Sequence, residues 1–253
     1  AKQAEVDQVM RDNLLPTNTY RPGFTPMVVN TGKQLVLFDT GNGEHGFVPR
    51  PNGGWLAAQL RPAGFAPEQI DVVVLSHGHP DHIGGLMEDG KPLFANARYV
   101  IPETEYQFWT SPDRMGSPME GVAKLTSANV VPFAEKATFV KGGADVATGI
   151  TAIDAPGHTP GHTAYMIESA GKPFLLWADT TNHYVLSVEK PEWHVGFDVD
   201  KDLAVKSRMA ILDMAATDRI LSTGYHMPFP AVGYVETSGE GYRWVPVSYQ
   251  LRM

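Results

Sequence analysis

The sequence contains no cysteine, and its apolar residues never form a long uninterrupted run. Without cysteine the chain has no disulfide, no thiolate metal ligand and no cysteine nucleophile. Because no apolar run reaches the roughly 18–20 residues that cross a bilayer, we expect a soluble protein with no membrane partner. The opening segment AKQAEVDQVMRDNLL is too polar for a signal peptide. We therefore expect a periplasmic or secreted location if a leader was removed before residue 1, and a cytoplasmic location otherwise.

Basic residues are also scarce, since 20 Lys and Arg stand against 28 Asp and Glu and give a net charge of −8. They are scattered along the chain, so no basic patch is available for a phosphate backbone and no nucleic-acid partner is expected. A chain of 253 residues with 43% hydrophobic residues can bury a large core. We expect a single domain over residues 1–253, in which residues 1–20 form a short helix and loop as a peripheral N-terminal extension.

Short apolar segments alternate with helical patterns, which is typical of an α/β fold. The predicted strands lie at residues 26–30, 34–41, 71–77, 97–102, 137–142, 150–156, 163–169, 173–180 and 219–224. The predicted helices lie at residues 54–65 and 201–218, the second with Asp200 as its N-cap. Residues 110–121 and 182–198 are rich in loop-forming residues and are expected to form loops or a lid.

The segment LSHGHPDHIGG at residues 75–85 gathers His77, His79, Asp81 and His82 at the end of a predicted buried strand. A single buried histidine is usually no more than a hydrogen-bonded core residue. Four such side chains within six positions favour a metal site, because neutral imidazole and carboxylate are ligands that zinc and its neighbours prefer. Pro80 and the glycines around it let the backbone turn these side chains towards one centre.

Three further strand ends present ligand-type residues. They are His158 in DAPGHTPGHT, Asp179 in LLWADT and His226 in STGYHMPFP. Taken singly, each has an ordinary interpretation as a turn histidine, a helix-capping aspartate or a surface histidine. Because α/β sheets build sites at one edge, their occurrence together with the first motif indicates a site with more than one metal ion.

At this point the sequence resembles a known family. The segments HGHPDH, GHTPGH, WADT and GYH resemble the metallo-β-lactamase-fold hydrolases. The segments VVNTGKQLVLFDTG, GHTPGHTAYMIES and GYRWVPVSY are similar to the methyl parathion hydrolase branch, which includes lactonases and arylesterases. The resemblance implies an αβ/βα sandwich, with two mixed β-sheets face to face and helices outside. It also implies two divalent metal ions per chain, most simply zinc, with manganese, cobalt or iron as alternatives, and a homodimer.

The resemblance also implies roles for individual residues. The first metal ion would be held by His77, His79 and His158, the second by Asp81, His82 and His226, and Asp179 would bridge the two. Asp39 in FDTG would orient a ligand histidine, or would simply make a turn before Gly41, and His162 would support the ligands. His45 and His194 receive no role.

Two metal ions imply hydrolysis by a metal-bridging hydroxide, with Asp81 and Asp179 as catalytic residues that pass a proton to the leaving group. Trp109 in EYQFWTS resembles an aromatic wall residue of the substrate pocket, although it could equally be core. His183, Phe47 and Phe197 are weaker pocket candidates. An aromatic-walled pocket suits neutral, ester-like small molecules.

The sequence therefore predicts a dinuclear metal-dependent hydrolase of lactones or aryl esters, with phosphotriester hydrolysis as a slower promiscuous activity. One alternative is an organophosphate phosphotriesterase as the main activity. Another is an iron-dependent persulfide dioxygenase, which has a similar ligand set. A non-catalytic binding protein on this fold normally lacks ligands, whereas all seven ligand-type residues are present here.

Overall fold

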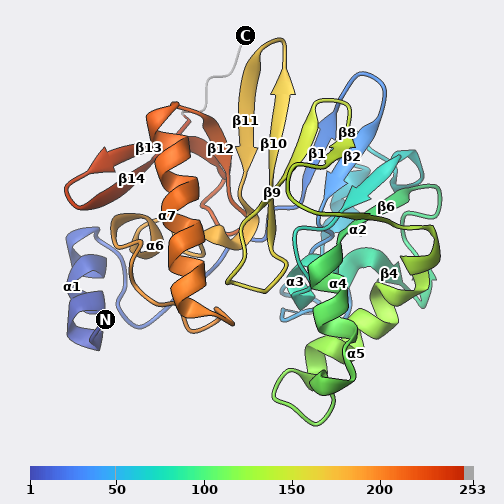
Figure 1. Cartoon of the computed structure of the whole chain (residues 1–253), viewed down its shortest axis with the longest axis horizontal. Coiled ribbons are helices and arrows are strands. Elements are labelled where there is room, and N and C mark those ends of the chain that lie inside the picture. Colours follow the sequence, from blue (N-terminus) through green and yellow to red (C-terminus); the bar gives the residue numbers. More distant parts are fainter. Residues whose placement is uncertain (49, 248–253) are drawn as a thin grey trace. The chain divides into compact units, whose positions relative to one another are not determined.

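The structure is a computed structural model that describes residues 1–48 and 50–247 (Figure 1). The chain forms two compact units. Unit 1 contains Ala1–Thr25, Ala155–His158 and the residues from Ala164 onwards, and unit 2 contains Pro26–Asp154 and Thr159–Thr163. The expectation of a single domain over the whole chain stays a prediction.

The centre of unit 2 is a mixed sheet with the strand order β1-β2-β3-β6-β7. Its strands are β1 (Met27–Asn30), β2 (Leu35–Phe38), β3 (Val72–Val74), β6 (Arg98–Pro102) and β7 (Thr138–Val140). The pair β1 and β2 is antiparallel, whereas β2, β3, β6 and β7 run parallel to one another. The three valines of β3 are completely buried, as expected of a parallel strand that is covered on both faces.

Helices and two short hairpins complete unit 2. They are α2 (Leu56–Leu60), α3 (Pro80–Ile83), α4 (Glu103–Thr110), α5 (Glu120–Asn129), the hairpin of β4 (Met87–Glu88) and β5 (Lys91–Pro92), and the hairpin of β8 (Asp145–Ala147) and β9 (Ile150–Asp154). Helix α4 packs against β6 and α5, and α5 packs against α3. The hydrophobic core joins Leu37, Val73 and Leu75 of the sheet region to Ile83 of α3. This core fixes the position of the histidine-rich segment that starts after β3.

The centre of unit 1 is a second mixed sheet, in which the strand order is β14-β13-β12-β11-β10. Its strands are β10 (Thr163–Ser169), β11 (Lys172–Leu176), β12 (Leu221–Thr223), β13 (Val232–Ser238) and β14 (Gly241–Pro246). Only β11 and β12 pair in parallel among these strands. The helices are α1 (Gln3–Asp12), α6 (Leu186–Glu189) and α7 (Lys201–Thr217). Helix α7, orange in Figure 1, packs against β13, while α6 packs against β14 and α1 against α6.

Most predicted elements are confirmed. The strand at residues 163–169 matches β10, and Asp200 caps α7 by accepting the backbone N–H of Leu203 at 3.0 Å. The predicted short N-terminal helix is α1. The predicted loops are interrupted by helix, since residues 110–121 include the start of α5 and residues 182–198 include α6. Among the described residues, no helix is both long enough and apolar enough to cross a membrane.

Candidate metal centre

In unit 2, the histidine-rich segment follows the carboxyl end of β3, and Asp39 follows the carboxyl end of its parallel neighbour β2. Parallel neighbours end at the same edge of a sheet, so the two segments meet there. His77 and His82 are fully buried, and Asp81 is 4% exposed. Of the candidate metal ligands in the two groups that the structure contains, His77, His79, Asp81 and His82 belong to this unit.

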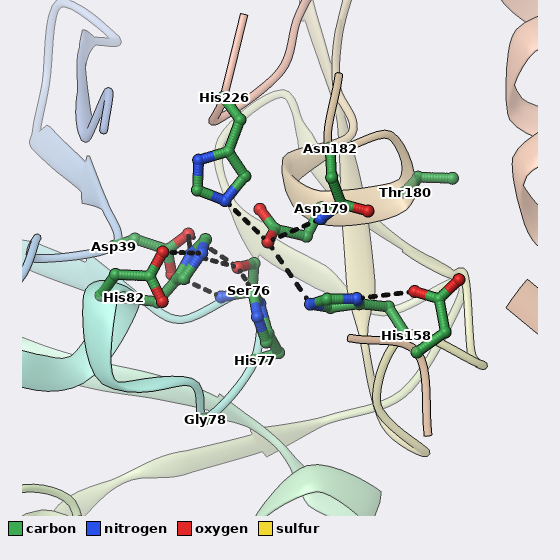
Figure 2. Close-up of polar contacts among 12 residues, drawn as sticks. Asp39, Ser76, His77, Gly78, His82, His158, Asp179, Thr180, Asn182 and His226 are labelled. Atoms are coloured by element: carbon green, nitrogen blue, oxygen red, sulfur yellow. Dashed lines mark hydrogen bonds and ion pairs between the residues drawn. The ribbon is translucent and has the colours of Figure 1, made fainter. Parts of the chain in front are cut away.

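Asp39 organises this edge of the sheet. Its backbone adopts the left-handed conformation, with φ of 55°, which aspartate tolerates better than most residues. One carboxylate oxygen accepts the Ser76 backbone N–H at 2.8 Å, and the other accepts the Ser76 hydroxyl at 2.7 Å and the His82 Nδ1–H at 2.8 Å. Because His82 donates from Nδ1, its Nε2 carries the lone pair that a metal ion needs (Figure 2).

The imidazole rings of unit 2 cluster around His77. The ring centroid of His77 lies 4.0 Å from that of His82, 4.7 Å from that of His79 and 5.1 Å from that of His162. The Nε2 atom of His82 lies 3.6 Å from an Asp81 carboxylate oxygen. His162 therefore lies beside the candidate ligand His77, and its predicted role in supporting the ligands stays a prediction.

Glu105 of α4 is a buried carboxylate that the sequence analysis missed, and it binds two ligand-bearing loops. One oxygen accepts the backbone N–H of Gly78 at 2.9 Å and the indole N–H of Trp109 at 2.5 Å, and the other accepts the backbone N–H of Gly161 at 2.9 Å. Burial raises the pKa of Glu105 above its usual value, although the hydrogen bonds from these donors partly oppose that shift. Both glycines are required, because a Cβ on Gly78 would lie 2.5 Å from Trp109 and one on Gly161 would lie 2.2 Å from the backbone of Glu105.

We expect Glu105→Gln to destabilise the metal-free protein by about 1–3 kcal/mol, because the new amide NH2 faces a buried N–H donor. Metal affinity should fall as well, since Gly78 lies between His77 and His79. Chemical unfolding of the metal-free protein and competition with a chromophoric chelator measure the two effects. Glu103→Gln is the matched control, because Glu103 lies on the same helix but makes an exposed ion pair with Lys141 at 2.7 Å. Equal effects of both substitutions would contradict this role.

In unit 1, Asp179 and His226 follow the parallel neighbours β11 and β12. Asp179 lies in a short 3-10 turn, Ala178–Thr180, and is 3% exposed. Its Oδ2 atom lies 3.0 Å from His226 Nε2 and 3.4 Å from His158 Nε2, and it accepts the Asn182 side-chain amide at 3.2 Å (Figure 2). Of the candidate metal ligands in the two groups that the structure contains, His158, Asp179 and His226 belong to this unit.

The donor atoms of unit 1 suit divalent transition metals. Ligand bonds of about 2.0–2.1 Å at tetrahedral angles place ligand atoms about 3.3 Å apart, close to the separations of Asp179 from the two histidines. The Nδ1 atoms of both rings have acceptors, Asp198 at 2.9 Å for His158 and the Gly23 carbonyl at 2.8 Å for His226. Their Nε2 atoms are therefore the ones that face Asp179. Burial lowers the pKa of His158, but Asp179 and Asp198 outweigh it and raise this pKa to about 9.

An apolar cavity of about 490 Å³ lies within unit 1. His183 and Phe197, both predicted pocket residues, line it together with Tyr20, Leu186 and Trp193. The Nδ1 atom of His183 accepts the backbone N–H groups of Val185 and Leu186 at 3.1 and 3.2 Å, so the proton of the neutral ring is on Nε2. Burial lowers the pKa of His183 to about 4, and the ring stays neutral at physiological pH.

The other two predicted pocket residues lie in unit 2. Trp109 is 2% exposed, with its ring centroid 5.9 Å from that of His79. Phe47 is 60% exposed, with its ring centroid 6.1 Å from that of His79. Contact of these two rings with substrate stays a prediction. His45 is exposed, and exposed His194 pairs with Asp202 at 3.0 Å, so neither lies in the clusters of candidate ligands.

Asp198 and Arg208 were also missed by the sequence analysis. A signal for Arg208 exists, because it stands at helical spacing from Ala204, Ile211 and Ala215 and so interrupts the apolar face of α7. A charge on such a face indicates a buried partner. No comparable local pattern marks Asp198, which lies in an irregular segment.

Comparison with known families identifies the superfamily of the chain. The model of the metallo-beta-lactamase superfamily matches residues 25–220. The match covers most of the 253 residues, and the chain belongs to the metallo-β-lactamase superfamily. Its mixed sheets with helices are the fold of that superfamily, which confirms the α/β class that the sequence predicted. The finer placement in the methyl parathion hydrolase branch stays a prediction.

Individual relatives include lactonases. Over 136 residues the chain is 30% identical to the N-acyl homoserine lactonase AttM of Agrobacterium fabrum, covering 50% of this chain and 48% of that protein. A second N-acyl homoserine lactonase, from a Bacillus species, is 26% identical over 151 residues, covering 59% of this chain and 54% of that protein. The chain spans about half the length of the curated relatives it matches.

Two solved structures are similar along nearly the whole chain. The dizinc quorum-quenching lactonase AidC, in complex with a homoserine product, superposes with a TM-score of 0.88 at 27% identity and covers 99% of this chain and 88% of its own. The hydrolase AbOPH of the beta-lactamase superfamily superposes with a TM-score of 0.91 at 25% identity, with the same coverage of 99% and 88%.

Proposed function

We propose that this protein is a metal-dependent hydrolase that opens lactone rings, with N-acylated lactones as the preferred substrates. The observation that carries the proposal is the buried Asp179 carboxylate, which faces the Nε2 atoms of His226 and His158 at 3.0 and 3.4 Å. The names of the relatives support the substrate class, since AttM is an N-acyl homoserine lactonase and AidC is a dizinc lactonase.

In this proposal the chain holds two divalent ions, as its resemblance to the superfamily implies. The resemblance implies that His77, His79 and His158 would hold one ion, that Asp81, His82 and His226 would hold the other, and that Asp179 would be a further ligand. Zinc suits this set of imidazoles and carboxylates, and manganese, cobalt and iron are alternatives. When bound, the two ions polarise the substrate carbonyl and lower the pKa of the attacking water.

The side chains of the protein provide the other steps. The carboxylates of Asp81 and Asp179 move a proton from the attacking water to the ring oxygen of the lactone as its C–O bond breaks. Asn182 donates its amide N–H to Asp179 and so holds that carboxylate in one orientation. The Nε2–H of His183 is a fixed donor at the cavity, suited to an amide or ester carbonyl of the substrate, because this ring stays neutral.

The cavity of unit 1 supports an acyl substituent on the lactone. Its volume of about 490 Å³ is in the range of small-molecule sites, roughly 300–1,000 Å³. Apolar side chains such as Leu186, Trp193 and Phe197 dominate its lining. Each methylene buried there contributes about 0.8 kcal/mol of binding free energy at most. A neutral acyl chain therefore fits the cavity better than an anionic group does.

We expect N-acyl lactones and aryl esters to be hydrolysed with higher kcat/KM than phosphotriesters with aryl leaving groups. A lactone needs only an apolar channel, whereas three substituents on phosphorus need several aromatic surfaces around the ions. Among N-acyl lactones, kcat/KM should rise by up to about fourfold per added methylene until the cavity is filled. A side-by-side assay of metal-loaded protein measures both trends. Higher kcat/KM for phosphotriesters, or no dependence on chain length, would contradict the proposed substrate class.

A further inference from the structure

Helix α7 carries a completely buried arginine on the face that it turns to the core of unit 1. Arg208 is 0% exposed and lies among apolar residues of that face such as Ala204 and Ile211. A buried guanidinium is costly unless its donors are paired. An apolar residue at this position would pack without the desolvation cost of a guanidinium. The role of Arg208 must therefore come from the groups to which it donates hydrogen bonds.

The guanidinium of Arg208 has four hydrogen-bond partners. Its Nε donates to the carbonyl of Thr180 at 3.0 Å, and one Nη donates to the carbonyls of Pro191 and Trp193 at 2.9 and 3.0 Å. The other Nη donates to Asp198 at 2.9 Å. A planar fork with five N–H donors can make all these bonds at once, which the point charge of a lysine cannot do.

Two of these partners lead to candidate metal ligands. Thr180 directly follows Asp179 in the same 3-10 turn (Figure 2). The bond from Arg208 to the Thr180 carbonyl therefore holds the turn that carries Asp179. Asp198 uses its second carboxylate oxygen to accept the Nδ1–H of His158 at 2.9 Å. Arg208 is thus linked to Asp179 through the backbone of Thr180 and to His158 through the Asp198 carboxylate.

The remaining partners lead to the cavity. Trp193 lines the cavity, and the segment that continues from it contributes Val195 and Phe197 to the same wall. The bonds from Arg208 to the carbonyls of Pro191 and Trp193 hold the start of this segment. The same side chain therefore connects the wall of the cavity to two ligands.

We propose that Arg208 is a positioning residue that orients His158 and Asp179 for metal binding and holds the wall of the acyl cavity through the same guanidinium. The inference rests on the metal centre of the proposed function. Arg208 acts on the ions only through Asp198 and the backbone of Thr180, which distinguishes it from a ligand.

A double-mutant cycle on metal affinity tests this role. The variants are Arg208→Met, Asp198→Asn and the double variant, with Lys206→Met as the matched control because Lys206 is an exposed cation on the same helix. Zinc affinity is measured by competition with a chromophoric chelator, and the stability of each metal-free variant by chemical unfolding. Each single substitution should weaken zinc binding about 10- to 100-fold. The loss in the double variant should be smaller than the product of the two single losses, because Arg208 and Asp198 share the route of contacts to His158.

Arg208→Lys keeps the test decisive if Arg208→Met does not fold. We expect this lysine variant to retain part of the zinc affinity, because it can pair with Asp198 but cannot reach all three carbonyls. A further readout is the visible spectrum of the cobalt-loaded protein, which should change in the Arg208 variants at saturating metal and not in Lys206→Met. Unchanged zinc affinity in both Arg208 variants, or fully additive losses in the cycle, would overturn the positioning role. Failure of the wild-type protein to bind zinc would instead overturn the proposed function.

Discussion

Replacing Asp179 by alanine is expected to lower the turnover of an N-acyl lactone by more than about 100-fold and to reduce the bound metal. The physical reason is the position of the Asp179 Oδ2 atom, 3.0 Å from His226 Nε2 and 3.4 Å from His158 Nε2. Without this carboxylate, both imidazoles lose the anionic ligand that their Nε2 atoms face. Steady-state kinetics and elemental analysis of the purified variant measure both losses.

His45→Ala is the control for this substitution. His45 is exposed and belongs to neither group of candidate metal ligands. Its replacement should therefore leave turnover and metal content close to those of the wild type. Comparable losses in the two variants would show that the site is elsewhere.

Exhaustive chelation is expected to abolish lactone hydrolysis, and zinc, manganese or cobalt should restore it. The chain offers no cysteine nucleophile, and the histidines and aspartates described above form groups that could hold metal ions. A reversible loss is expected rather than denaturation, because the core of each unit consists of buried apolar side chains that are not candidate ligands. Hydrolysis rate and circular dichroism, recorded before chelation, after it and after metal addition, distinguish the two outcomes.

The positions of the ligand-type residues along the fold could be predicted from the sequence. The continuous apolar run before His77 is a buried strand, and His77 lies just after its end. His226 follows β12 in the same way. This part succeeded because strand ends and their flanking glycines are local features that periodicity reveals. The assignment of each residue to a particular ion stays a prediction.

The supporting contacts could not be predicted, because they join residues that are distant in the sequence. Glu105 accepts N–H groups from Gly78 and Gly161, which are 27 and 56 positions away. Arg208 connects Thr180 to Asp198, and nothing in either local segment marks the pairing. Only the packed fold brings such partners together.

Some secondary structure was missed for a related reason. The hairpin of β13 and β14 was not predicted, because several of its residues are exposed and the apolar alternation is weak. Residues 110–121 were predicted to be a loop because they include Pro112 and Gly116, which are typical of loops. Helix α5 nevertheless begins within this segment, at Glu120. Tertiary packing decided these elements, since α5 lies against α3 and α4.

We propose that lactone hydrolysis by this chain requires two bound metal ions. The most direct test of this requirement is a titration of zinc into verified metal-free protein while the opening of an N-acyl lactone is followed. The predicted result is negligible hydrolysis at the start and a rate that rises to a plateau at two zinc ions per chain. Full hydrolysis before any zinc is added, or no hydrolysis at the plateau of binding, would contradict this requirement for two ions.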